Sequence, residues 1–329
     1  MLEQMPDVVL TKLLEKLDFQ SILCLRKVSA HLLNFIDDTK PGLHLTGIHI
    51  DVFPERIVLG LRDDYTKFKA QYEIHENGCS LDFNYRKNRK VLLSDMNFVD
   101  VFLRDFGIIW KLRTSILDGF CLKFSYDLIH DDCVNPIVDR IFDGIKNVLQ
   151  SGVYSFKIRN FDVSVYKEKQ VSELLSLVDS NVLESISIKN SNHKDSDGFK
   201  LDEISNLDQW KNAMKAEILN CILINPFQKF SHFSEATFHI RMISEEELRD
   251  LMENLRNSLS FQKFIVYINY IDKNMIEIVF GNHFVDNGRG KYWYLQTKNN
   301  GKVLKIFVYG MMICFTSVEI CTVPEGYLL

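Results

Sequence analysis

The chain has 329 residues, of which 46% are hydrophobic and 12% aromatic, and its net charge is −5. This composition is sufficient for a packed core and excludes a disordered chain. The mild negative charge gives no reason to expect a nucleic acid or an acidic membrane surface as partner. The most apolar run, residues 306–318, resembles a buried strand and is too short to span a bilayer, so we expect no membrane partner either.

The start of the chain and its cysteines predict where the protein works. Glu3 and Asp7 follow Met1 closely, without the basic and apolar segments that make up a secretory signal. The seven cysteines lie far apart and show neither a disulfide framework nor a metal-type spacing. We therefore expect reduced thiols and a cytoplasmic or nuclear protein.

Residues 5–36 predict three short helices. Pro6 suits the first turn of a helix, and Asp7 places a carboxylate where the helix dipole favours it. Apolar residues then recur at spacings of three and four, which is typical of an amphipathic helix, and Asp18 is a suitable N-cap for the second helix. So short a segment buries too little surface to fold alone, so we expect another part of the chain to cover it.

The same segment resembles an F-box, in which Leu-Pro-Asp precedes a leucine-rich helix, an acidic turn and a Val-Ser or Val-Cys pair. Met5 replaces the usual leucine at little cost in volume, whereas Leu32 stands where a large tryptophan anchor is frequent. The matching residues are Met5, Pro6, Asp7, Leu10, Leu13, Leu14, Leu17, Asp18, Ile22, Leu25, Val28 and Ser29. The resemblance implies a Skp-family adaptor, and through it a cullin, as partners, with the adaptor docking on Met5, Pro6, Val9, Leu13, Leu17, Leu25 and Val28.

The apolar period changes from 3.6 to 2 after Pro41 and Gly42, which predicts a boundary there and makes residues 1–42 the first segment. Strand-like runs at 44–52, 56–61, 67–75 and 80–85, with a hairpin signal at Asn77-Gly78, predict an antiparallel meander. A helix is predicted over residues 95–112. The meander and this helix form the second segment, residues 43–118.

Residues 119–329 form the third segment, which begins with a repeated strand, helix, strand pattern. Strand cores are predicted at 120–124, 154–158, 183–188, 236–240 and 264–268, and Ser244 and Glu247 form a capping box at the start of one helix. Such units fit either a doubly wound sheet or a curved, leucine-rich-repeat-like array. The lack of a glycine-rich turn after the early strands favours the array. Residues 292–308 predict a hairpin that caps it, and the predicted fold class is mixed α/β.

Residues 207–219 and 230–264 resemble the FTH domain that follows the F-box in the nematode F-box A family. The two resemblances together cover residues 5–40 and about 150–280. They imply that the FTH-type domain holds a target protein.

No pattern in the chain predicts an enzyme, a cofactor or a metal site. No Ser, Cys or His lies in a nucleophile elbow, and Gly288-Arg289-Gly290 lacks the third glycine and the following helix of a phosphate loop. The four adjacent side chains of residues 130–133 cannot all reach one ion, and the cations of residues 86–90 suit a solvated turn. We therefore expect a non-catalytic protein.

One face of the predicted array is basic. If the apolar strand residues face the helices, the alternate residues line the open face, and these include lysine and arginine but no acidic residue. This supports the hypothesis that the face binds an acidic or phosphorylated target, and the alternative is that the lysines only protect strand edges. The candidate target-binding residues are Lys123, Lys157, Arg159, Lys189, His239, Arg241 and Tyr267.

These observations predict an F-box substrate receptor that recruits a target protein to a Skp–cullin–RING ubiquitin ligase. The alternative is an interaction adaptor that works without ubiquitin transfer, for example by pairing with an RNA-binding or a foreign protein. Direct RNA binding through the basic face is a third hypothesis, which the scarcity of aromatic residues among the alternate positions disfavours.

Overall fold

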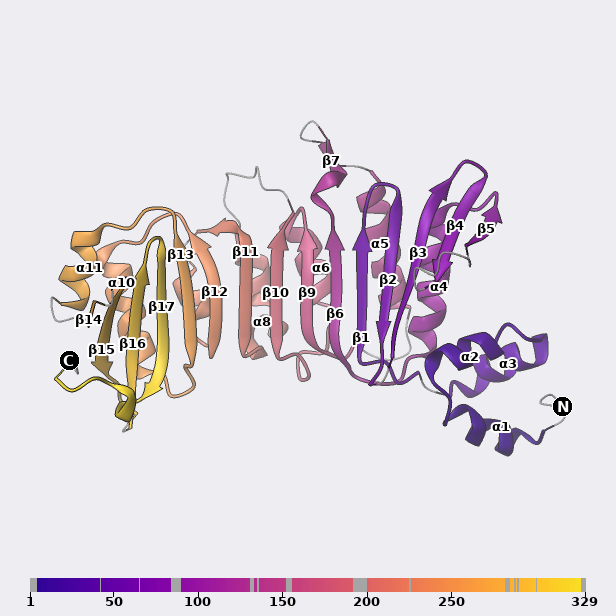
Figure 1. The fold of residues 1–329 in the computed structure, drawn as a ribbon, viewed down its shortest axis with the longest axis horizontal. Helices are drawn as coiled ribbons and strands as arrows, with labels where there is room; N and C mark the ends of the chain where they lie inside the picture. The colour runs from indigo at the N-terminus through magenta and orange to yellow at the C-terminus, as the bar shows by residue number, and fades with distance from the viewer. Residues whose placement is uncertain are drawn as a thin grey trace. The chain divides into compact units, whose positions relative to one another are not determined.

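The computed structural model describes residues 5–41, 43–64, 66–83, 90–130, 133–134, 136–151, 156–191, 200–224, 226–281, 285–286, 288, 290–299 and 301–326. They form two compact units, Met1–Asp162 with Ser176–Val182, and Val163–Leu175 with Leu183–Leu329. Each unit is mixed α/β, with helices against one face of its strands and the other face open (Figure 1). The division between the units does not coincide with the predicted boundary between residues 118 and 119.

The first unit begins with the three predicted helices. Asp18 accepts a hydrogen bond from the Ser21 N–H at 2.7 Å and caps the second helix, as predicted, and Ser29 caps the third. Pro6 is the N-cap of the first helix and lies just before its first residue. The helices are α1 (Asp7–Leu14), α2 (Phe19–Leu25) and α3 (Ala30–Thr39).

The sheet of the first unit contains the predicted antiparallel meander, in which each strand pairs with the next. Gly78 begins the fourth strand with φ of 135°, and a Cβ there would collide with the Leu93 carbonyl, so the hairpin requires glycine. A sixth strand then pairs parallel to the first. The strands are β1 (Gly47–Val52), β2 (Arg56–Arg62), β3 (Lys67–His75), β4 (Gly78–Phe83), β5 (Val91–Ser94) and β6 (Leu117–Phe124).

Two helices, α4 (Phe98–Leu112) and α5 (Ile137–Gln150), cover the apolar face of this sheet. Tyr72 of β3 packs edge-on against Phe102 of α4 at 5.7 Å between ring centroids. Phe156 meets both Trp110 of α4 and Phe120 of β6 at 5.1 Å, also edge-on. These rings are buried and form the core of the first unit. Short elements η2 (Tyr126–Leu128), β7 (Ile129–His130) and β8 (Cys133–Val134) connect β6 to α5.

In the second unit, four parallel strands and four antiparallel strands lie in the order β10-β11-β12-β13-β17-β16-β15-β14. Trp210, Phe230 and Phe238 form its aromatic core, and the predicted capping box at Ser244 and Glu247 is present. The strands are β10 (Ser185–Asn190), β11 (Lys215–Leu223), β12 (Glu235–Ile240), β13 (Lys263–Ile268), β14 (Val285–Asp286), β15 (Lys291–Gln296), β16 (Lys302–Tyr309) and β17 (Met312–Glu319). The helices are α6 (Glu168–Leu175), α7 (Asp202–Asn206), α8 (Asp208–Asn212), α9 (Phe227–Phe230), α10 (Glu245–Asn257), α11 (Lys273–Phe280) and η3 (Ile320–Thr322).

Three strand predictions were wrong in detail. The strand expected at 154–158 is β9 (Ile158–Val165), and residues 152–155 lie outside the described part. The prediction omitted β11, which fills the long step between the third and fourth predicted strands. The run 306–318, expected to be one buried strand, is divided between β16 and β17, because Gly310 adopts a φ of 56° and lets the chain reverse. The predicted hairpin of β15 and β16 is confirmed.

Candidate functional site

The seven residues predicted to contact an adaptor lie on the outer side of the first two helices and their loops. Val9 and Val28 expose 46% and 65% of their surface, whereas Leu10 and Leu14, on the other side of α1, expose 1% and 2%. Pro6 is exposed as well, and the remaining members are half-buried, namely Met5, Leu13, Leu17 and Leu25. The structure therefore separates the leucines that form the small core from the apolar residues that remain open to a partner.

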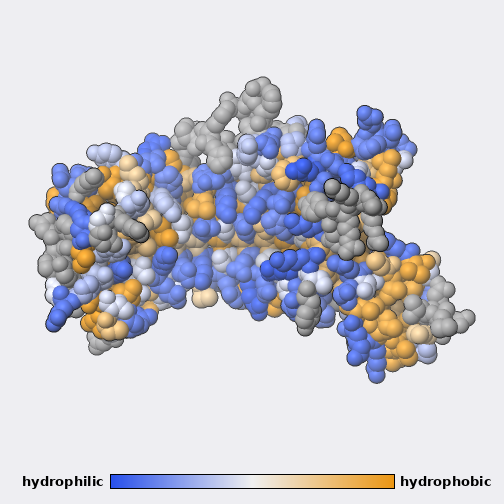
Figure 2. All heavy atoms as spheres, in the orientation of Figure 1, coloured by the Kyte–Doolittle hydropathy of each residue, from blue (hydrophilic) through white to orange (hydrophobic). Residues whose placement is uncertain are grey.

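This outer side is more apolar than the motif alone indicated. Val8 exposes 68% of its surface and was not among the predicted residues. Figure 2 shows apolar residues gathered over the surface of α1, α2 and α3. Contiguous exposed apolar surface on a folded protein marks an interaction site.

The three helices are anchored to the first sheet. Phe19 of α2 is 3% exposed and packs edge-on against Phe68 of β3, with ring centroids 6.0 Å apart. Arg26 and Asp37 join α2 to α3 through two hydrogen bonds of 2.7 Å. A cavity of about 350 Å³ lies between α2, β3 and α4. The expectation that another part of the chain covers the short helices is therefore confirmed.

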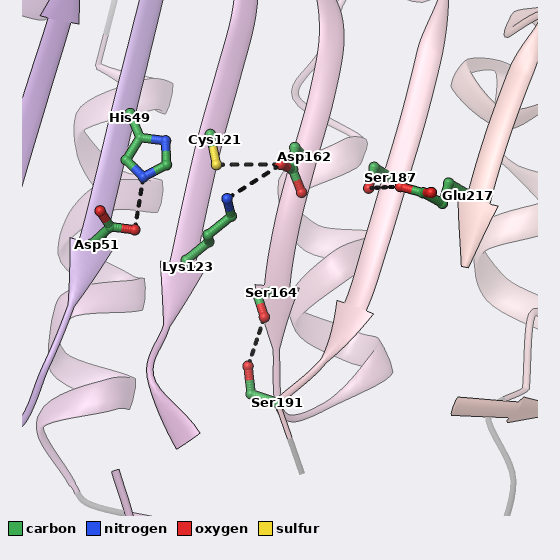
Figure 3. A network of polar contacts seen from close by, with 9 residues as sticks. All are labelled: His49, Asp51, Cys121, Lys123, Asp162, Ser164, Ser187, Ser191 and Glu217. Carbon is green, nitrogen blue, oxygen red and sulfur yellow. Dashed lines mark hydrogen bonds and ion pairs between the residues drawn. The ribbon is translucent and has the colours of Figure 1, made fainter. Parts of the chain in front are cut away.

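The open face of the first sheet carries a network of polar side chains, of which Figure 3 shows the main members. On β1, His49 Nε2 lies 2.7 Å from Asp51 Oδ1. On β6, the Cys121 thiol donates to Asp162 Oδ2 at 3.4 Å, and Lys123 Nζ lies 3.8 Å from the same oxygen. The parallel register places His49 beside Cys121 and Asp51 beside Lys123.

Burial and the Asp162 carboxylate raise the pKa of the Cys121 thiol to about 12, so at neutral pH it is a neutral donor and not a nucleophile. Burial lowers the pKa of Lys123, but Cys121 and Asp162 raise it more, so the net shift is upward. The lysine therefore stays charged, and its charge faces a carboxylate of the same chain.

The prediction that this face lacks acidic residues was wrong. Arg159 and Asn160 are both exposed at the start of β9, which shifts the alternation and turns Asp162 to the open face while Phe161 is buried. Arg159 itself lies 2.7 Å from Asp118 of β6. Lys123 and Arg159 thus both face carboxylates of their own unit.

Lys157, the third candidate in the first unit, is exposed and precedes β9. Its carbonyl accepts a hydrogen bond from the Leu117 N–H at 3.1 Å.

The other four candidates lie in the second unit. His239 of β12 is beside Tyr267 of β13 in the parallel register, with ring centroids 6.5 Å apart. The His239 ring nitrogen Nε2 lies 2.5 Å from Asn269 Oδ1. Arg241 is exposed directly after β12, and Lys189 is half-buried on β10.

The open face of the second unit also has carboxylates that the predicted alternate set did not include. Ser187 donates to Glu217 at 3.1 Å and the Ser164 and Ser191 hydroxyls are 2.8 Å apart, as Figure 3 shows. Lys215 Nζ lies 2.6 Å from Glu235. Glu217 belongs to β11, the strand that the sequence pattern did not reveal.

The described residues show no group of three or more His, Cys, Asp or Glu side chains placed to hold a metal ion. The runs 130–133 and 86–90 and the Gly288-Arg289-Gly290 turn fall partly outside the described residues. Among the helices that the structure describes, none is long and apolar enough to cross a membrane.

Comparison with protein-family models identifies two domains in this chain. The F-box domain matches residues 2–44, and the FTH domain matches residues 139–283. No curated protein and no solved structure matches the chain. An F-box domain supports a role as an interaction adaptor of the SCF type, and F-box proteins are generally non-catalytic. The matched domains, in this order along the chain, identify it as a protein of the F-box plus FTH architecture.

Proposed function

We propose that this protein is a substrate receptor of a Skp–cullin–RING ubiquitin ligase. Its F-box would dock a Skp-family adaptor through Met5, Pro6, Val9, Leu13, Leu17, Leu25 and Val28. The observation that carries this proposal is the two-sided character of α1, in which Leu10 and Leu14 are buried while Val9 remains exposed. Burying such apolar surface against an adaptor is the main source of affinity in an interface of this kind.

The second half of the proposal is that the FTH domain holds the target. The receptor would then act by proximity, because a target held beside a ubiquitin-loaded enzyme reacts as if the step were intramolecular. The candidate residues Lys189, His239, Arg241 and Tyr267 belong to this domain and remain proposals, as does a leucine-rich-repeat-like arrangement of its βα units. Lys123, Lys157 and Arg159 are weaker candidates, because carboxylates of the same unit face two of them.

Co-expression with a Skp-family adaptor tests the F-box half of the proposal. We expect the full-length chain to co-purify with the adaptor, and Leu13→Asp to abolish the complex by burying a charge in an apolar interface. Val28→Asp is a second variant, since Val28 is 65% exposed and its replacement leaves the core intact. Val91→Asp is the matched control, because it adds the same charge at an exposed apolar position of β5 that lies outside the F-box.

Each result has a definite meaning. Retention of the adaptor by both Leu13→Asp and Val28→Asp would contradict the proposed interface. Failure of the unaltered chain to bind any Skp-family adaptor would contradict the receptor function and favour an adaptor that works without ubiquitin transfer. Addition of the cullin to the complex extends the test to the assembled ligase.

A further inference from the structure

The C-terminal strands extend the open face of the second unit with aromatic residues. In the antiparallel register Tyr267 of β13 pairs with Met312 of β17, and Met312 pairs with Tyr309 of β16. Phe307 of β16 pairs in turn with Tyr292 of β15. Because paired residues point to the same side of a sheet, these side chains share one face, and His239 of β12 extends the row.

Large apolar side chains continue from this face onto the adjoining loops. Tyr309 is 58% exposed and Tyr267 is 40% exposed, while Met242, Tyr270 and Met311 expose 63%, 66% and 56% of their surface. Backbone hydrogen bonds hold the loops together, since the Tyr270 N–H donates to the Arg241 carbonyl and the Ile268 N–H donates to the Met311 carbonyl. We call the surface formed by Met242, Tyr267, Tyr270, Phe307, Tyr309 and Met311 the aromatic patch.

On the strand positions of this open face, lysines outnumber carboxylates. Lys305 Nζ lies 4.7 Å from the centre of the Tyr292 ring, and Arg241 precedes Met242 at the edge of the patch. The two carboxylates on the described strand positions of this face are Glu217 and Glu235, and both have partners, Ser187 and Lys215. The lysines on the same face are Lys189, Lys215, Lys263 and Lys305, of which Lys215 is the partner of Glu235. This distribution complements a negatively charged partner.

The arrangement of the rings favours a protein over single-stranded RNA. Tyr292 and Phe307 are stacked at 4.5 Å between centroids and 21° between planes, and Phe307 and Tyr309 are nearly parallel at 6.3 Å. The Tyr292 ring thus covers one face of the Phe307 ring, whereas a nucleobase needs an open ring face. Ring edges and the flexible thioether of Met311 suit apolar side chains.

We propose that the aromatic patch binds an acidic segment of a target protein that carries large apolar side chains. Tyr309, Tyr267 and Met311 would contact its apolar residues, and Lys305 would pair with its carboxylates. This inference rests on the proposed receptor function and adds to it the chemistry of target binding and a place for it, which continues from the FTH domain onto the strands that follow residue 283.

The test uses the full-length chain and a display library of random short peptides as probe. We expect the selected peptides to combine Asp or Glu with Phe, Tyr, Leu, Ile or Met. The Tyr309→Ser/Met311→Ser double variant should bind them about tenfold more weakly or worse, because aromatic anchors dominate such interfaces. Tyr126→Ser/Met214→Ser is the matched control, since these residues are 66% and 52% exposed but lie outside the patch, and it should bind as the unaltered chain does.

A second variant, Lys305→Glu, tests the contribution of charge and leaves the aromatic side chains in place. It should weaken binding of the same peptides in a salt-dependent manner. Selection of basic peptides, absence of any selected peptide, or equal binding by the double variant and the unaltered chain would overturn the proposal. Binding of oligouridylate RNA that is lost in the double variant would overturn it in favour of RNA.

Adaptor capture on the same preparations distinguishes this inference from the receptor function. The double variant should retain the Skp-family adaptor, which also shows that it is folded, and Val28→Asp should retain the peptides. If the unaltered chain binds the peptides but no adaptor, the receptor function fails while the peptide site stands.

Discussion

The open face of the first unit and the open face of the second differ in chemistry, although helices cover the opposite side of each sheet. In the first unit the outward side chains are polar and face one another, as Cys121, Lys123 and Asp162 do. In the second unit the C-terminal strands turn Phe307 and Tyr309 outward. A charged side chain that already contacts an opposite charge gains little by binding a partner, whereas an exposed ring can still be buried. We therefore assign target binding to the second unit.

Truncation of a core residue has the largest expected effect. It tests whether the cores of the two units are packed equally well. Phe120 and Phe238 are fully buried, on β6 and β12 respectively. We expect Phe120→Ala and Phe238→Ala each to lower the free energy of unfolding by about 3–5 kcal/mol, through lost burial and a residual cavity. Urea unfolding monitored by circular dichroism measures both. A loss near zero in one unit alone would show that its strands are not packed as described.

A pair of open-face substitutions sharpens the comparison. Phe307→Ala removes a stacked ring and should cost about 1–2 kcal/mol, because aromatic pairs contribute beyond the area they bury. Lys123→Ala breaks a partly exposed ion pair of 3.8 Å and should cost less than about 1 kcal/mol. The same unfolding measurement ranks the two variants. The reverse ranking would mean that the polar network, and not the aromatic patch, stabilises its unit.

The smallest expected effect concerns the Cys121 thiol, whose pKa is raised from 9.0 to about 12. Between these values the unfolded chain loses the thiol proton and the folded chain keeps it, so this group stabilises the fold below about pH 9 and the contribution falls as pH rises towards 12. At pH near 8, iodoacetamide should therefore modify the exposed Cys24 and Cys321 and leave Cys121 unmodified, as peptide mass spectrometry would show. Equal modification of Cys121 and Cys24 would contradict the half-buried contact between the Cys121 thiol and Asp162.

Local signals in the sequence predicted much of the fold. The capping residues Asp18 and Ser244 indicated helix starts that the structure confirms, and the Asn77-Gly78 hairpin was found because glycine alone tolerates the required φ. The F-box resemblance also named Val9, which is exposed, but the motif equally matches the buried Leu10 and Leu14, and adaptor contact by Val9 and Leu13 stays a prediction. These features depend on neighbouring residues, which a single sequence displays directly.

The features that sequence reasoning missed depend on partners distant in the chain. The shift at Arg159 and Asn160, which turns Asp162 outward, interrupts a period of two without any glycine or proline to mark it. Asp118 could not be assigned to Arg159 before the strands were aligned, 41 residues apart. The aromatic patch was missed for the same reason, because its rings come from strands that the sequence did not connect to β13.

The antiparallel pairing of β17 with β13 has a consequence for how this domain can evolve and associate. β17 occupies the edge that a further βα repeat would need, so duplication of repeats cannot lengthen the parallel array at this side without displacing the hairpin. The described strands end instead at β14, which is two residues long. Its two residues pair with Lys291 and Tyr292 of β15, so the described edge is divided between two strands, and a divided edge is a poorer template for a strand from another chain than one long strand.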